Sequence, residues 1–241
     1  MVEVTARDEG EGVPAVADVA VRRLRWTACA RVVPSRFPAT DLFERVAEPA
    51  DHDAVIAVES MTNDRLRDER GETQAVAERD RSMGPGSSVI MAPFTHISPF
   101  GGRFTDGTYG AYYAAKTRET AIRETVYHRE RFMAATSEPA MDLEMRLLEA
   151  DLDGMLHDVR TIGSSALYDP ESYADSQIFA RAVRAAGSNG IAYRSVRHAG
   201  GQCVAVFRPR LLRRGRQADY LLYRWDGERI AEVLQLTHRM T

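Results

Sequence analysis

Lysine and cysteine are both scarce in this chain of 241 residues. Lys116 is the only lysine, so arginine carries nearly all of the positive charge and no arginine is informative merely for being one. The two cysteines, Cys29 and Cys203, are too few for a disulfide framework and lack the spacing of metal ligands. We therefore expect reduced thiols, no metal site and a cytoplasmic protein.

Long apolar runs and a strong net charge are also missing. No uninterrupted apolar stretch reaches the roughly 18 residues that a membrane-spanning helix needs. The opening MVEVTARDEGEG lacks the charged and apolar regions of a signal peptide. The net charge of −3 gives no general attraction to nucleic acid or to anionic membranes. With 44% hydrophobic residues, the composition is that of a soluble globular protein.

The sequence predicts three regions. Residues 1–24 are acidic and weakly patterned, which favours a loose amino-terminal tail. Residues 25–87 are predicted to be a mainly helical extension packed on the core, in which Thr40 or Asp41 caps a helix. Residues 88–241 form the main domain.

Two segments at the start of the main domain favour strands. Residues 89–97, VIMAPFTHI, are rich in β-branched and aromatic side chains, and residues 108–115, TYGAYYAA, alternate small and aromatic ones. In the second segment Tyr109, Ala111 and Tyr113 would share one face.

The rest of the main domain mixes helices and strands. Thr117 is a plausible cap for a helix over residues 118–131, and SQIFARAVRAAG reads as a helix ended by Gly187. MDLEMRLLEADL, IAYRSV and CVAVFRP favour strands, and Asp226-Gly227 indicates a hairpin. Because regular βαβ alternation is missing, we expect an α+β fold with a mixed sheet of short strands and flanking helices.

Glu124 is the first candidate for chemistry. A helical wheel places it nearly opposite Ile122 and Val126, which is typical of a solvated surface carboxylate. Its neighbours in the sequence favour a role in a functional site instead. Arg103 and Tyr113 precede Glu124 within one strand–helix hairpin, which can bring all three residues to the same cleft edge.

Arg103 and Tyr113 suit an anionic, aromatic ligand. Arg103 follows two glycines in a flexible turn, and its guanidinium can bind phosphate oxygens bidentately. The alternative for Arg103 is an ion pair with Asp106. Tyr113 can stack on a heteroaromatic ring and donate its hydroxyl, or simply pack in the core, and Tyr109 and Tyr112 compete for the same role.

Ser195 lies in the segment YRSVRH, and a lone serine in a strand is usually structural. His198 is poorly placed to be its base, because three residues along a strand end reverses the face. The chain has no GxSxG motif. His96, His128 and His198 also lack the spacing of a metal site.

In order and spacing these motifs resemble the RES-domain family, which is named for its arginine, glutamate and serine and whose members are toxins of bacterial toxin–antitoxin pairs. The resemblance covers residues 88–210 well, and more weakly the stretch from RVVPSRFP onward. The longer amino-terminal region, residues 1–87, departs from the shortest family members. The segments that carry the resemblance are GGRF, YGAYYAA, AIRET, YADSQIFARAVRAAGSNGIAYRSVR and CVAVFRP.

The resemblance implies an ADP-ribosyltransferase-like fold and an enzyme that cleaves the nicotinamide–ribose bond of NAD, with phosphate or water as acceptor. No cofactor would be permanently bound, since NAD is the substrate and inorganic phosphate the co-substrate. The implied catalytic residues are Arg103, Tyr113, Glu124 and Ser195. The implied ligand-binding residues are Arg31, Tyr109, Gln177 and Arg194.

Two other functions stay open at this point: ADP-ribosylation of a protein target by the same residues, and an inactive interaction module with a RES-like fold. The partner implied by the resemblance is a helical antitoxin with a DNA-binding domain. We expect no direct contact with nucleic acid or membrane, and homo-oligomer formation stays open.

Overall fold

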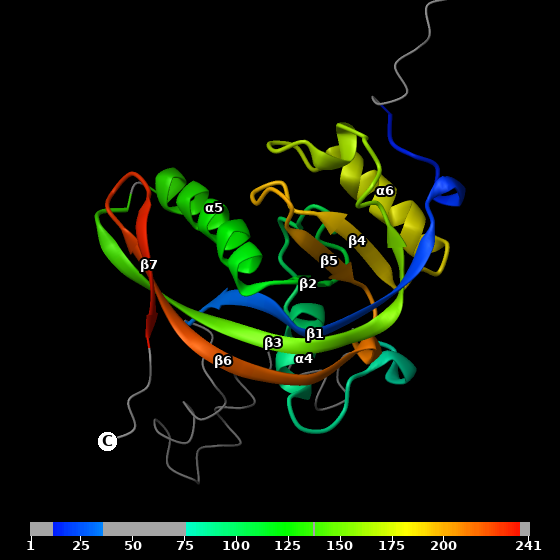
Figure 1. Cartoon of the computed structure of the whole chain (residues 1–241), viewed down its shortest axis with the longest axis horizontal. Coiled ribbons are helices and arrows are strands. Elements are labelled where there is room, and N and C mark those ends of the chain that lie inside the picture. Colours follow the sequence, from blue (N-terminus) through cyan, green and yellow to red (C-terminus); the bar gives the residue numbers. More distant parts are fainter. Residues whose placement is uncertain (1–11, 36–75, 137, 237–241) are drawn as a thin grey trace, which may run out of the picture.

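The computed structural model describes residues 12–35, 76–136 and 138–236, and the fold below refers to these residues. Three long strands form a curved floor: β1 (Val21–Pro34), β3 (Met141–Asp158) and β6 (Leu212–Trp225). Figure 1 shows helix α5 over one half of this floor, and the short strands with helix α6 over the other half.

The seven strands belong to one sheet, in the order β1-β2-β5-β4-β3-β6-β7, and β1 also pairs with β3. This extra pairing closes β1, β2, β5, β4 and β3 into a ring, while β6 and β7 extend the sheet beyond β3. Only the contact between β3 and β4 is parallel. The remaining strands are β2 (Tyr112–Ala115), β4 (Gly190–Arg194), β5 (Gln202–Val206) and β7 (Ile230–Leu236). The expected α+β fold with a mixed sheet is confirmed, although β1, β3 and β6 are longer than anticipated.

Two predicted segments have a different structure. Residues 89–97, predicted as a strand, lie largely in helix α4 (Ser87–Thr95), because an apolar run buried on several sides has no period that separates a strand from a helix. Residues 25–34, assigned to a mainly helical extension, are instead part of β1. The helix predicted after Thr40 or Asp41 lies outside the described residues.

Local signals at the ends of elements are confirmed. Helix α5 (Arg118–Thr136) begins where Thr117 caps it, and the Thr117 hydroxyl oxygen accepts the Thr120 amide at 3.2 Å. Helix α6 (Ala174–Ala185) ends before Gly187, whose φ of +81° is the left-handed conformation that a glycine tolerates. The Asp226-Gly227 turn joins β6 to β7 as predicted.

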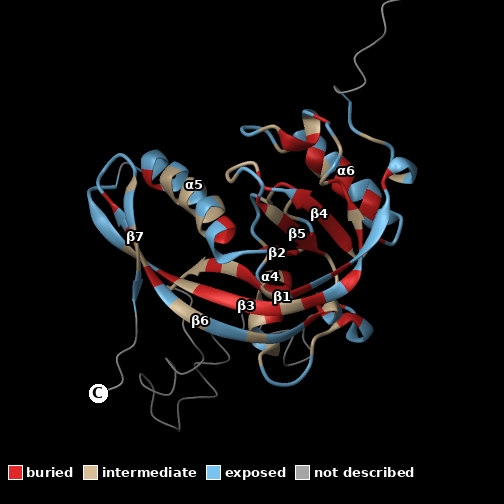
Figure 2. Cartoon of the chain, in the orientation of Figure 1, coloured by how far each residue is buried: buried red, intermediate tan, exposed pale blue. Residues whose placement is uncertain are grey.

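Two hydrophobic cores lie on the two faces of the sheet (Figure 2). Along β5, Cys203 and Ala205 face the core that contains Phe179 of α6, whereas Val204 faces the core that contains Phe94 of α4. This alternation explains why the short strands are almost entirely apolar. The segments that connect these elements contain short 3₁₀ helices at Val16–Asp18, Glu78–Asp80, Ala166–Tyr168 and Pro209–Leu211.

The curvature of the floor coincides with two bulges that share one carboxylate. Ala28 in β1 and Arg214 in β6 have φ values of +54° and +53°, a conformation that non-glycine residues rarely adopt. Asp151, on β3 between them, accepts the Ala28 amide at 2.9 Å and pairs with the Arg214 guanidinium. We infer that this carboxylate stabilises both bulges. Within the described segments, no helix is both long and apolar enough to cross a bilayer.

Candidate active site

The side chains of Glu124 and Ser195 meet beside helix α5. Glu124 lies in the middle of α5, and Ser195 directly follows β4. The Ser195 hydroxyl lies 2.5 Å from Glu124 Oε1, while its oxygen accepts the backbone amides of Arg197 at 3.1 Å and His198 at 2.9 Å. Because the serine oxygen accepts two amides, its proton is directed to the carboxylate. No described residue hydrogen-bonds Oε2 of Glu124, so that oxygen is available to a ligand.

One face of α5 explains why Glu124 is not a solvated surface residue. Thr120, Glu124 and Tyr127 are spaced so that they share this face, and all three contact the loop of residues 195–201. Thr120 Oγ1 lies 2.9 Å from His198 Nδ1. The helical wheel predicted that this face of α5 is exposed, but polar contacts with residues 195–201 cover it.

Arg103 lies in the loop between α4 and β2 and is only 8% exposed. Its guanidinium donates to the Leu167 carbonyl oxygen at 3.0 Å and lies over the ring of Tyr173 at 4.7 Å. Asp106, the alternative partner, pairs instead with Arg181 at 3.0 Å. No described carboxylate forms an ion pair with Arg103 at hydrogen-bonding distance, although backbone hydrogen bonds and, to a smaller extent, the charge of Arg103 lower the pKa of Asp169.

Two of the predicted site residues hold the Arg103 loop in place. The Tyr113 hydroxyl oxygen accepts the Phe104 amide at 2.9 Å, and Gln177 Nε2 donates to the carbonyl oxygens of Gly102 at 3.0 Å and Thr105 at 3.1 Å. Burial raises the pKa of Tyr113, so its hydroxyl stays protonated. Tyr113 and Gln177 therefore stabilise the backbone of the loop that carries the Arg103 guanidinium.

The two other predicted arginines also bind carbonyl oxygens and aromatic rings. Arg31 donates to the Tyr113 carbonyl oxygen at 3.1 Å, and burial lowers its pKa. Arg194 is exposed, donates to the Ile162 carbonyl oxygen at 3.1 Å and lies 3.9 Å above the Tyr168 ring.

Tyr109 was the alternative to Tyr113 for a ligand contact, but its side chain packs against other residues of the protein. It precedes β2 and so does not share a strand with Tyr113. Its hydroxyl donates to the Phe104 carbonyl oxygen at 2.9 Å, and Arg184 of α6 covers its ring at 4.4 Å.

Arg103 and Glu124, 21 residues apart in the sequence, act on the same neighbouring groups. Burial raises the pKa of Tyr173, which Arg103 lowers and Glu124 raises. Burial also raises the pKa of Tyr193, again with opposite contributions from Glu124 and Arg103. Both charges therefore act on one region of the molecule. Tyr173 and Tyr193 carry no sequence motif of their own and could not be predicted as neighbours of these charges.

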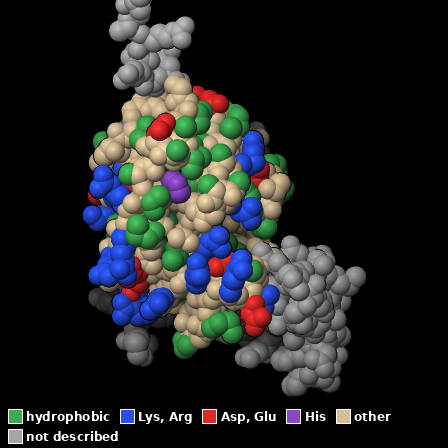
Figure 3. Space-filling model, turned by 90° about the vertical axis from the view of Figure 1, so that its right-hand side faces the viewer, with side chains coloured by type: hydrophobic (Ala, Val, Ile, Leu, Met, Phe, Trp, Pro, Cys, Tyr) green, Lys and Arg blue, Asp and Glu red, His purple; other side chains and the backbone are tan. Residues whose placement is uncertain are grey.

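Several arginines elsewhere on the surface pair with carboxylates, whereas four near the candidate site do not. On the face that Figure 3 shows, arginines gather with carboxylates beside them. Ion pairs of this kind join Arg23 to Asp153, Arg160 to Asp158, Arg208 to Asp80 and Arg216 to Glu149. The arginines near the candidate site with no described carboxylate partner are Arg31, Arg103, Arg194 and Arg197. Their uncompensated charge suits an anionic ligand.

Neither a serine–histidine pair nor a metal cluster is present in the described residues. His198 contacts Ser195 through its backbone amide, while its ring contacts Thr120. No group of three or more histidine, cysteine, aspartate or glutamate side chains in the described ranges could hold a metal ion. The polar groups of the described residues that gather in this region include the Glu124 carboxylate, the Ser195 hydroxyl and the Arg103 guanidinium.

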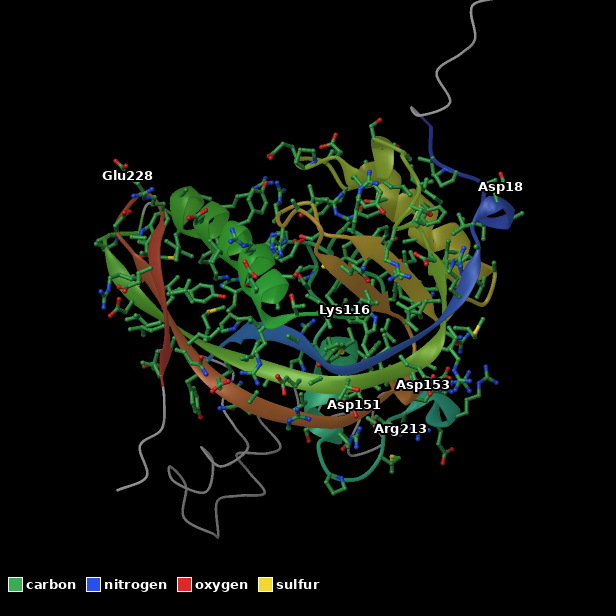
Figure 4. The ribbon with its side chains drawn as sticks, viewed as in Figure 1. Asp18, Lys116, Asp151, Asp153, Arg213 and Glu228 are labelled. Carbon is green, nitrogen blue, oxygen red and sulfur yellow. The ribbon has the colours of Figure 1, made fainter. Side chains whose placement is uncertain are left out.

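A separate hollow of about 440 Å³ lies on the other side of the floor, lined by Leu152, Leu211, Arg214 and the labelled Asp151, Asp153 and Arg213 (Figure 4). Its carboxylates are paired, Asp151 with Arg214 and Asp153 with Arg23. Lys116, in contrast, lies between α5 and the short strands in the same view.

The model of the RES domain matches residues 81–226, a range that includes Arg103, Tyr113, Glu124 and Ser195. The chain belongs to the RES-domain family. This RES protein is also 30% identical over 201 residues to the uncharacterized protein y4oC of Sinorhizobium fredii, covering 83% of this chain and 84% of that protein.

A solved structure is also similar to this RES protein. It is the crystal structure of the M. tuberculosis MbcT–MbcA toxin–antitoxin complex, at a TM-score of 0.44 and 15% identity, covering 81% of this chain and 86% of that chain.

Proposed function

We propose that this RES-domain protein is a toxin-type enzyme that cleaves the nicotinamide–ribose bond of NAD and transfers ADP-ribose to phosphate or water. The observation that supports this most is the Glu124 carboxylate, oriented by Ser195 at 2.5 Å, in a region where Arg103 has no described carboxylate partner. One negative and one positive group match the two charges of the substrate, the cationic nicotinamide ribose and the anionic pyrophosphate.

Glu124 would act on the charge that develops as the glycosidic bond breaks. The electron pair of this bond goes to the pyridinium nitrogen, so nicotinamide leaves as a neutral molecule and needs no general acid. Positive charge builds up on the ribose, as in the oxocarbenium-like transition state of glycoside hydrolysis. The acceptor oxygen then bonds to the anomeric carbon, and its proton passes to solvent.

Ser195 and Arg103 would supply orientation. With Oε1 of Glu124 hydrogen-bonded to Ser195, Oε2 can accept a ribose hydroxyl. The Arg103 guanidinium can bind phosphoryl oxygens with its remaining N–H groups. Tyr113 and Gln177 would keep the Arg103 loop in position, and Arg31 and Arg194 would provide further phosphate contacts.

The test is incubation of the purified protein with NAD, with and without phosphate, and identification of the products by mass. We expect phosphate-dependent formation of a phosphorylated ADP-ribose. Glu124→Gln keeps the shape and removes the charge, so it should lower the rate on the order of 10²–10³-fold. Glu228→Gln, at an exposed carboxylate in the turn between β6 and β7, is the matched control and should leave the rate nearly unchanged.

Other outcomes would select a different function. A protein labelled by radioactive NAD would indicate ADP-ribosylation of a macromolecule. If folded protein leaves NAD intact in every reaction, the proposed NAD-cleaving activity is refuted. The remaining function is then that of an inactive interaction module.

We also propose a partner, a helical antitoxin with a DNA-binding domain that covers the region beside Glu124. Co-expression with the product of a small adjacent gene tests this idea, because a true antitoxin should co-purify and suppress NAD cleavage.

A further inference from the structure

Arg197 lies two residues after Ser195 and had no role in the sequence analysis. Its guanidinium donates to the Pro170 carbonyl oxygen and lies 3.3 Å from the centre of the Tyr127 ring. Its backbone amide donates to the Ser195 hydroxyl oxygen at 3.1 Å. Arg197 is therefore fixed at both its backbone and its side chain, directly beside the Ser195–Glu124 pair.

Arg103 and Arg197 are attached to the same short segment, residues 167–173. Arg103 binds the Leu167 carbonyl oxygen and lies over the Tyr173 ring, and Arg197 binds the Pro170 carbonyl oxygen between these two points. Two guanidinium groups that come from different loops thus converge on one stretch of backbone, and neither has a described carboxylate partner.

Arg131 provides an internal comparison. It lies over the same Tyr127 ring, at 5.8 Å, and donates to the Tyr127 hydroxyl at 3.1 Å. Unlike Arg197, it has an acidic partner, Glu171, at 3.4 Å. Two arginines therefore contact one tyrosine, but only the one beside Ser195 lacks a compensating charge among the described residues.

The electrostatics of the neighbouring groups agree with this geometry. Burial raises the pKa of Tyr173, while both Arg103 and Arg197 lower it and Glu124 raises it. For His128, desolvation lowers the pKa, Glu124 opposes this change, and Arg197, Arg129 and Arg103 add to it. Arg103, Arg197 and Glu124 therefore all act on the same place.

We propose that Arg197 and Arg103 form a two-arginine clamp for a phosphoryl group beside Glu124. Guanidinium groups bind phosphoryl oxygens through paired hydrogen bonds, and two of them balance a dianion. The phosphoryl group belongs either to the pyrophosphate of a dinucleotide or to inorganic phosphate as acceptor, an identity that rests on the proposed function. Because the Arg197 amide also donates to the Ser195 hydroxyl oxygen, the loop that carries Arg197 holds the Glu124 carboxylate through Ser195.

Calorimetric titration with two probes, ADP-ribose and inorganic phosphate, tests the clamp without requiring turnover. Arg197→Gln should weaken binding of at least one probe on the order of 10–100-fold. Arg197→Lys should fall between this variant and the wild type, because it keeps the charge but loses the planar fork. Arg131→Gln, on the same tyrosine, should bind both probes as the wild type does.

The pattern over the two probes identifies the source of the phosphoryl group. A loss confined to ADP-ribose assigns the clamp to the dinucleotide, and a loss for phosphate assigns it to the acceptor. Equal affinities of wild type and Arg197→Gln for both probes, or no binding of either probe by the wild type, would overturn the clamp. Equal weakening in Arg197→Gln and Arg131→Gln would also overturn it, because packing on Tyr127 would then explain the loss.

These outcomes are distinct from those of the NAD assay. Arg197-dependent binding without NAD cleavage would refute the proposed function and keep the clamp. NAD cleavage together with probe affinities that Arg197→Gln leaves unchanged would support the proposed function and refute the clamp. Melting temperatures of all variants, compared with the wild type, exclude unfolding as the cause.

Discussion

The Ser195 hydroxyl lies 2.5 Å from a carboxylate oxygen of Glu124, although 71 residues separate the two in the sequence. The same hydroxyl oxygen accepts two amides of its own loop, from Arg197 and His198. Ser195 therefore links the loop after β4 to helix α5, and the orientation of the carboxylate depends on this link.

Ser195→Ala should reduce NAD cleavage at least about tenfold and lower the free energy of unfolding by about 1–2 kcal/mol, since it removes one donor and leaves two amides without an acceptor. Initial rates and urea denaturation measure the two effects. A variant with an unchanged rate would show that the hydroxyl does not set the position of Glu124.

Gln177→Glu should impair the Arg103 loop. A carboxylate cannot donate to the carbonyl oxygens of Gly102 and Thr105, which the Gln177 amide now binds. We expect a loss of about 1–3 kcal/mol in stability and a higher KM for NAD. The neighbouring Ile178, 52% exposed on the same helix, supplies the control Ile178→Gln, which should behave like the wild type in both measurements.

Asp151→Asn should destabilise the two bulges of the floor by about 1–2 kcal/mol near neutral pH. Burial alone would raise the pKa of Asp151, but the Ala28 amide and Arg214 outweigh it and hold the pKa below its usual range. Since the folded pKa is lowered, this stabilisation is present above the unfolded value of about 3.9 and is lost as the pH falls through the folded value.

The difference in stability between wild type and Asp151→Asn should accordingly shrink below about pH 4. Denaturation at a series of pH values measures it. Asp153→Asn, at an exposed carboxylate on the same strand, should stay close to the wild type throughout. A difference that grows on acidification would contradict the assignment.

Gly227→Ala should cost about 1 kcal/mol, because Gly227 has a φ of +106° in the hairpin between β6 and β7. Gly163→Ala is the matched control, since an added methyl group there meets no atom within 4 Å and φ is not left-handed. It should be neutral or slightly stabilising. Thermal denaturation of both variants decides the question, and equal melting temperatures would count against strain in the turn.

Signals that act within a few residues could be read from the sequence. The cap at Thr117, the helix end at Gly187 and the turn at Gly227 each depend on the conformation or hydrogen bonding of one residue, and each is confirmed. The closed ring of strands could not be predicted this way, because the pairing of β1 with both β2 and β3 joins segments that are far apart in the chain.

The candidate site was only partly predictable, for a related reason. Glu124 faces a polar loop, and a helical wheel detects burial against apolar neighbours only. Tyr173 and Arg197 went unnoticed because their partners are carbonyl oxygens and ring faces, which occur along the whole chain and leave no pattern of residue types. Helix α4 was misread because its apolar residues showed no clear period.

Lys116 gives this protein a built-in attachment point for a spectroscopic reporter. It is exposed, it is the only lysine side chain of the chain, and it lies just before the helix that carries Glu124. A fluorophore coupled there through amine chemistry would report on ligand binding near Glu124, with no cysteine engineering, in the natural sequence.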